Sequence, residues 1–202
     1  CLARITMLHD AFSGPRTALA DSSIVLRAET KFSTDHECVM AYELTRHRFL
    51  ELLRTYQPSS YEAFGQGDTR FTIPMHHAMK CRDRLHVALK SGLRRLPSEK
   101  QTIVDLGPFP GSLLRLLRSL EYTKSAQLFG AGLMASEDFV RGMQRDVQAD
   151  ILTVNLDPAG GHFQSKGYPE KVPLPDDSVQ LVFALEIIEH LTSPFHLLAE
   201  AH

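Results

Sequence analysis

The sequence predicts an α/β fold in which a parallel β-sheet follows a mainly helical N-terminal region. Three observations lead to this prediction. From about residue 101 onward, short apolar runs alternate with amphipathic segments. The runs are apolar at consecutive positions, which is typical of strands covered on both faces. Before residue 98, apolar residues recur instead at spacings of three to five, which is typical of helices.

The N-terminal region, residues 1–98, is expected to act as a helical lid over the second domain, residues 99–202. Residues 1–30 are weakly patterned. A first helix is predicted over residues 33–56, before Pro58, and a second over residues 75–96, where Pro97 ends it. Pro, Ser, Gly and Asp are frequent between the two helices, so a loop is predicted there.

The second domain is expected to contain four parallel strands joined by right-handed crossovers. The strands are predicted at residues 102–106, 126–129, 151–156 and 179–185, and helices at residues 112–120, 136–145 and 194–201.

Composition narrows the functional classes. The hydrophobic share of 43% and the charged share of 23% are those of a globular protein, not of a disordered or collagen-like chain. The net charge of −2 gives no overall reason to expect nucleic acid or an anionic membrane. Three scattered cysteines favour a reducing compartment over a disulfide framework. With no signal peptide and no long apolar run, we expect a cytoplasmic protein without a membrane partner.

The first informative motif is IVDLGPFPGS, residues 103–112. A buried strand ends near Asp105, and Gly107 lets the backbone turn sharply where a side chain would block a ligand. Gly111 lets the next helix begin close to the sheet, so that its unpaired N–H groups face the turn. Nucleotide-like ligands bind at such a turn in open α/β sheets, although many similar turns bind nothing.

The second motif is LPDDSVQLVFALEIIEHL, residues 174–191, a turn and an apolar strand that ends at two glutamates and a histidine. With the first motif about seventy residues earlier, this segment resembles the class I, Rossmann-like S-adenosylmethionine-dependent methyltransferases. The resemblance covers about half of the chain. It implies a strand order of 3-2-1-4, with S-adenosylmethionine bound across the first and fourth strands.

The resemblance also implies roles for single residues. The methionine end of the cofactor would lie against the first motif, and an acidic residue after the second strand would bind the ribose. Here that position holds Gly132, so either Glu137 or Asp138 would replace it. The residues expected to bind the cofactor are Asp105, Gly107, Pro108, Phe109, Gly111, Asp157, Leu185 and Glu186.

Three of these residues carry open questions. Phe109 replaces the middle glycine of the usual pattern and lies between two prolines, which makes the turn stiffer. Asp157 is either a hydrogen-bond acceptor for the adenine amino group or a turn residue before Pro158. Glu186, together with His190, is a candidate general base for a hydroxyl acceptor.

The segment EIIEH raises a metal alternative. In the small-RNA 2′-O-methyltransferases such a segment binds a divalent ion, with a further histidine downstream. Glu186, Glu189 and His190 are one ligand short of that set, so we expect no metal site.

The methyl acceptor, a small molecule or a macromolecule, is left open. A basic helix over residues 75–96 keeps nucleic acid as an alternative, but a solvated charged face is the preferred interpretation. Two other functions stay open: a regulatory protein that kept only the fold, and a nucleotide-dependent oxidoreductase, for which the GxGxxG pattern is incomplete.

The sheet looks truncated, because the chain ends in the helix after the fourth strand. The apolar edge of the strand at residues 179–185 would then need a cover. The N-terminal helices, a partner chain in an oligomer, or a continuation beyond His202 are the three candidates.

Overall fold

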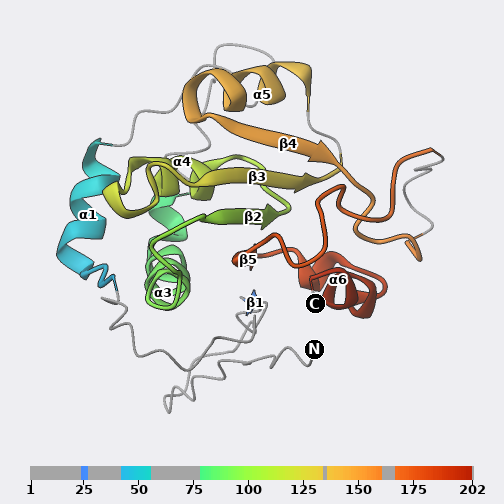
Figure 1. Cartoon of the computed structure of the whole chain (residues 1–202), viewed down its shortest axis with the longest axis horizontal. Coiled ribbons are helices and arrows are strands. Elements are labelled where there is room, and N and C mark those ends of the chain that lie inside the picture. Colours follow the sequence, from blue (N-terminus) through green and yellow to red (C-terminus); the bar gives the residue numbers. More distant parts are fainter. Residues whose placement is uncertain (1–23, 27–41, 56–77, 134–135, 161–166, 202) are drawn as a thin grey trace.

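The protein contains one sheet with four parallel strands and a fifth, antiparallel edge strand (Figure 1). The computed structural model describes residues 24–26, 42–55, 78–133, 136–160 and 167–201. Across the sheet the strands are ordered β1 (Ile24–Leu26), β5 (Leu181–Ala184), β2 (Thr102–Leu106), β3 (Gln127–Gly132) and β4 (Ala149–Thr153). The predicted order 3-2-1-4 of the parallel strands is confirmed.

Helices cover both faces of this sheet, as the runs of consecutive apolar residues predicted. On one face, a core joins Ile103, Leu128 and Phe183 of the sheet to most of the helices. On the other face, Val104 and Val182 pack with Leu197 of the last helix. The helices of the first face are α1 (Arg46–Thr55), α3 (Arg82–Leu93), α4 (Ser112–Ser119), α5 (Glu137–Gly142) and its π-helical continuation η3 (Met143–Val147), and α6 (Pro194–Glu200) lies on the second.

The free edge of β5 is covered by a strand that the sequence did not predict. β1 pairs with β5 in antiparallel register, with Val25 opposite Phe183. Residues 1–30 lack a clear pattern, and three residues are too few to show an alternation, so only the pairing reveals this strand. The N-terminal region covers the edge, but through a strand and not through its helices.

Three of the four predicted strands have other boundaries: β3 is Gln127–Gly132 instead of 126–129, β4 is Ala149–Thr153 instead of 151–156, and β5 is Leu181–Ala184 instead of 179–185. β3 continues three residues beyond Phe129, through glycines that allow a close approach of the neighbouring segment. A Cβ built on Gly130 would lie 2.7 Å from Cβ of Pro108, so the ring of Pro108 packs directly on the strand. β4 begins at Ala149 and not at Ile151, immediately after Gln148 ends the preceding π-helix with a φ of 54°.

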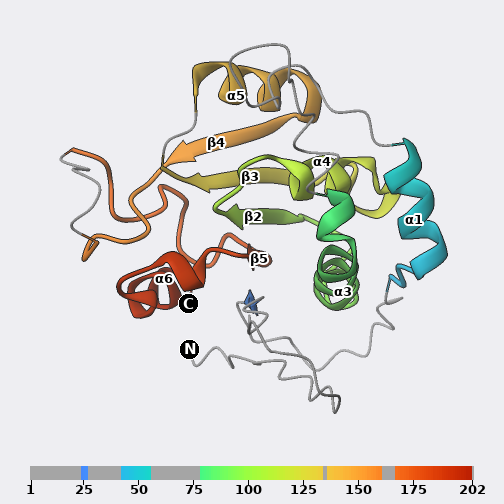
Figure 2. The same cartoon turned by 180° about the vertical axis from the view of Figure 1, so that it is seen from behind.

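The described part of the N-terminal region agrees with helices at two of the predicted places. α1 and α3 fall inside the predicted ranges 33–56 and 75–96. Residues 33–41 and 56 of the first range, residues 75–77 of the second, and the loop at residues 57–73 lie outside the described residues. Both views show α1 and α3 as neighbours on one side of the fold (Figures 1 and 2). Among the described helices, none is long and apolar enough to span a bilayer.

Candidate functional site

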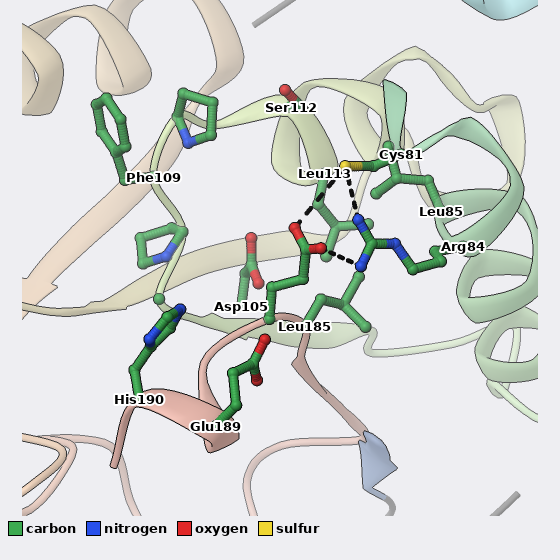
Figure 3. Close-up of a pocket in the computed structure, with 14 residues that line it drawn as sticks. Cys81, Arg84, Leu85, Asp105, Phe109, Ser112, Leu113, Leu185, Glu189 and His190 are labelled. Carbon is green, nitrogen blue, oxygen red and sulfur yellow. Dashed lines mark hydrogen bonds and ion pairs between the residues drawn. The ribbon is translucent and has the colours of Figure 1, made fainter. Parts of the chain in front are cut away.

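A cavity of about 330 Å³ opens at the carboxyl ends of β2 and β5 (Figure 3). From β2 the chain winds in one direction to β3 and β4, and it then returns to the other side of β2 as β5. The cavity therefore lies at the point where the strand order reverses, which is the usual place for ligands in open α/β sheets. Its lining comprises Cys81, Arg84, Leu85, Asp105, Gly107, Pro108, Phe109, Pro110, Ser112, Leu113, Leu185, Glu186, Glu189 and His190.

Asp105 is the buried carboxylate of this cavity. It lies on the central strand, opposite Gly130 of β3 and Phe183 of β5, and only 4% of its surface is exposed. Its carboxylate accepts no hydrogen bond from any described residue. Burial raises the pKa of Asp105 to about 8, because a charged carboxylate loses its hydration there. A cation that entered the cavity would favour the ionised form.

The turn after Asp105 depends on two glycines in the left-handed region. Gly107 has a φ of 76° and Gly111 a φ of 93°, both strained for residues with a side chain. A Cβ on Gly107 would lie 2.8 Å from Cδ1 of Ile187. A side chain at this position would therefore meet Ile187 at the border of the cavity.

Gly111 precedes the first residue of α4 and has no place in the cavity lining. A Cβ at this position would meet the sulfur of Met143 at 2.9 Å, so the glycine allows α4 to pack against η3. Phe109 is 48% exposed at the cavity rim, and its ring packs on that of Phe139 at a centroid distance of 5.6 Å. The residue that replaces the middle glycine is thus supported by α5.

Glu186 follows β5 and has a φ of 54°, an uncommon conformation for a residue with a long side chain. Its carboxylate forms an ion pair with Arg84 of α3, and the two side chains are 33% and 32% exposed. The Cys81 thiol donates to Oε2 of Glu186 at 3.7 Å and accepts from Nη2 of Arg84 at 3.0 Å. This cluster ties α3 to the end of β5 across one side of the cavity (Figure 3).

Glu189 and His190 belong to the 3₁₀-helix η4 (Ile188–His190) and are exposed at the opposite side. In Figure 3 both side chains point from η4 toward the region of Asp105 and the β2 turn. Glu186, Glu189 and His190 all line the cavity. No group of three or more His, Cys, Asp or Glu side chains among the described residues is arranged to hold a metal ion.

Asp157 lies apart from the cavity. Its carboxylate accepts hydrogen bonds from the backbone N–H groups of Thr192, at 2.8 Å, and Ser193, at 3.1 Å, just before α6. Burial acts to raise the pKa of Asp157, but these hydrogen bonds outweigh it and lower the pKa below its ordinary value. Of the two interpretations from sequence, the geometry agrees with the bracing of a turn, because both oxygens are engaged by the backbone.

The two candidates for the ribose carboxylate also lie apart from the cavity. Gly132 is the last residue of β3, so the expected position offers no side chain. Glu137 and Asp138 are 88% and 79% exposed in the first turn of α5, where both pair with Arg141. Neither carboxylate is part of the cavity lining.

The sequence analysis did not predict that α3 forms one wall of the cavity. Cys81, Arg84 and Leu85 follow each other at spacings of three and one, so they share one side of a helix. That spacing was visible, but Arg84 was assigned to the solvated charged face. Only the packing of α3 beside β5 shows that its guanidinium reaches the cavity.

Comparisons with known proteins give no assignment. No family model, no curated protein and no solved structure matches this chain.

Proposed function

We propose that the chain binds S-adenosylmethionine in this cavity and catalyses methyl transfer to an acceptor. The observation that carries the proposal is Asp105: a buried carboxylate, without a partner among the described residues, that faces a cavity at the reversal point of a parallel sheet. A cationic ligand supplies the charge that such a carboxylate lacks. S-adenosylmethionine supplies an ammonium group and an activated methyl group on a positively charged sulfur.

The charges of the lining favour this cofactor over a nicotinamide dinucleotide. The carboxylate of Glu186 is paired with the guanidinium of Arg84, which leaves Glu189, and Asp105 once it is ionised, as the negative groups of the lining that no cation balances. An anionic pyrophosphate would meet net repulsion there, whereas a cation is attracted. The absence of a ribose carboxylate after β3 leaves the cofactor held mainly by Asp105, the Gly107–Pro110 turn and Leu185.

His190 and Glu186, which both line the cavity, are assigned different roles. His190 is exposed beside the cavity, so its imidazole can accept a proton from a hydroxyl or amine acceptor. The Glu186 carboxylate is engaged by Arg84 and Cys81, so we assign it to holding α3 in place and leave the general-base role to His190. In-line methyl transfer requires alignment of donor and acceptor and no protein nucleophile.

Calorimetric titration with S-adenosylhomocysteine tests the proposal, and NAD serves as the competing ligand. The Gly107→Val variant should lose at least about 100-fold in affinity for S-adenosylhomocysteine, because the turn cannot keep its φ of 76° beside Ile187. Gly167→Val is the matched control: Gly167 has a φ of 103°, but no atom lies within 4 Å of its Cβ position. This control should keep the wild-type affinity.

Thermal unfolding of each variant establishes that the protein measured is folded, and Gly107→Ala replaces the valine variant if that one does not fold. A folded Gly107 variant with unchanged affinity would refute the placement. Binding of NAD but not of S-adenosylhomocysteine to the wild type would refute the proposed cofactor.

A further inference from the structure

Positive charge is concentrated on the helices that precede the sheet. Residues 42–55 and 78–95 contain nine Lys or Arg and three Asp or Glu. The described residues from 96 to 201 contain seven Lys or Arg and fourteen Asp or Glu. The net charge of −2 for the whole chain is therefore the sum of a basic part and an acidic part.

Several cations on α3 and in the turns that flank it have no carboxylate partner. Lys80, Lys90, Arg94 and Arg95 are exposed, and none of them forms an ion pair with a described residue. Lys80 precedes α3, Lys90 lies in its last turn, and Arg94 and Arg95 follow it; the N–H of Arg94 donates to the carbonyl of Lys90, so these two side chains lie on the same side of the helix. We refer to these four side chains as the basic face. Asp83, in the first turn of α3, is paired with Arg46 of α1 at 2.8 Å.

The opposite side of α3 is not available to any partner. Leu85, Leu89 and Leu93 are buried in the core against the sheet, with exposed fractions of 4% or less. A helix that binds a bilayer in its plane must insert its apolar side, and α3 has already buried that side inside the protein. The available surface is largely charged, and two apolar side chains, Met79 and Val87, are 42% and 53% exposed beside the cations. This surface fits a polyanion and not a lipid bilayer.

The basic face lies on α3 and its flanking turns, and α3 also contributes to the wall of the cavity. Arg84 lies between Lys80 and Lys90 in the sequence, and its guanidinium lines the cavity together with Cys81 and Leu85. A chain of phosphates along the basic face would therefore pass beside the cavity mouth. Polyanions with regularly spaced phosphates gain affinity from each cation that replaces a counterion.

We propose that the basic face binds the phosphodiester backbone of a nucleic acid. The proposed binding of nucleic acid depends on charge and burial alone and is independent of the ligand of the cavity. A further step rests on the proposed function: if the cavity binds S-adenosylmethionine, nucleic acid is the class of the methyl acceptor. No base-specific contact is part of the proposal, because phosphate contacts position a nucleic acid without reading its sequence.

Fluorescence anisotropy with labelled 20-nucleotide RNA and DNA, each single-stranded and double-stranded, tests the basic face. We expect binding to the full chain that weakens as salt rises from 50 to 200 mM. The double variant Lys90→Glu/Arg94→Glu should lower the affinity at least about 10-fold, and the slope of log K against log salt should fall by about 1.4 for single strands. Both side chains are exposed, so the fold should tolerate these changes.

The control double variant is Lys124→Glu/Lys171→Glu, which makes the same change of net charge at exposed sites away from α3. It should affect binding much less than the α3 variant. An equal loss in the two variants would show a general charge effect and overturn the proposal, as would no binding of any nucleic acid at 50 mM salt.

The last measurement tests binding of the full chain to vesicles that contain phosphatidylserine. Binding to these vesicles without binding to nucleic acid would assign the face to a membrane and refute the proposal. Affinity of the α3 variant for S-adenosylhomocysteine, measured in parallel, should equal that of the wild type, so a failure of the basic face can be told apart from a failure of the cavity.

Discussion

The carboxylates of Asp105 and Asp157 lie at the same edge of the sheet in opposite environments. Asp105, at the end of the central strand, is buried, has no hydrogen-bond partner among the described residues and faces a cavity. Asp157, four residues after β4, receives two backbone N–H groups from the segment that begins α6. Their pKa values are accordingly shifted in opposite directions, upward for Asp105 and downward for Asp157.

The difference distinguishes a binding group from a structural one. A carboxylate whose oxygens already accept hydrogen bonds from the backbone stabilises the native state and has little capacity to bind a ligand. An ionised, buried carboxylate without a partner destabilises the ligand-free protein, and this cost is removed either by protonation or by a bound cation. Variants at these two positions should therefore have opposite effects on stability and unequal effects on binding.

The largest expected effect is a stabilisation by Asp105→Asn. A pKa of about 8 in the folded state, against 3.8 in the reference, means that the folded state binds the proton more tightly. The wild type should lose stability as the pH rises from about 4 to about 8, whereas the amide variant lacks this loss. Its advantage in unfolding free energy should be near zero at pH 4 and reach several kcal/mol at pH 9, with an upper limit of about 6 kcal/mol.

Urea unfolding at pH 4.5, 6.5 and 9 measures this advantage, with Asp157→Asn as the control. If Asp105→Asn were less stable than the wild type at pH 9, the carboxylate would have a stabilising partner, and the comparison would fail.

The second effect concerns affinity for S-adenosylhomocysteine. Asp105→Asn should weaken binding about 30-fold or more, because an amide cannot replace the charge that pairs with the ligand's ammonium. In the wild type, affinity should increase with pH up to about 8 and then level off, since binding requires the ionised carboxylate.

Titration calorimetry in two buffers of different ionisation enthalpy should detect the proton released on binding at pH 7. The Asp157→Asn variant should bind with nearly the wild-type affinity and the same proton release. A comparable loss of affinity in both variants would assign Asp157 to the cofactor site after all.

The smallest effect is the loss of stability in Asp157→Ala. This change removes the acceptor for the N–H groups of Thr192 and Ser193, so the unfolding free energy should fall by about 1–2 kcal/mol at pH 7. Because the folded pKa is lowered, the contribution is present above pH 4 and disappears as the pH falls through that folded value. Urea unfolding at pH 7 and pH 3 checks both parts, and an unchanged stability at pH 7 would show that water satisfies these amides equally well.

The sequence by itself predicted the parallel sheet, and the resemblance carried by its two motifs implied the strand order and the place of a ligand. Largely apolar runs at 102–106 and 181–184 favour burial on both faces, and the glycines at 107 and 111 permit a turn in the left-handed region. These features depend on local patterns, which a single chain displays directly. Asp105, Gly107, Pro108, Phe109, Leu185, Glu186 and His190, which the sequence analysis named as site residues, all line the cavity.

Only the tertiary structure decided what each side chain meets. Nothing near Asp157 in the sequence shows that its partners lie 35 and 36 residues later, and nothing near Arg84 shows an ion pair with Glu186. The cover of β5 by Ile24–Leu26 is likewise a pairing of distant segments without a local signal. The strand order was implied by the resemblance of two local motifs to a known fold. The partner of a charged group depends instead on long-range packing, which decides whether that group is already hydrogen-bonded or remains able to bind a ligand.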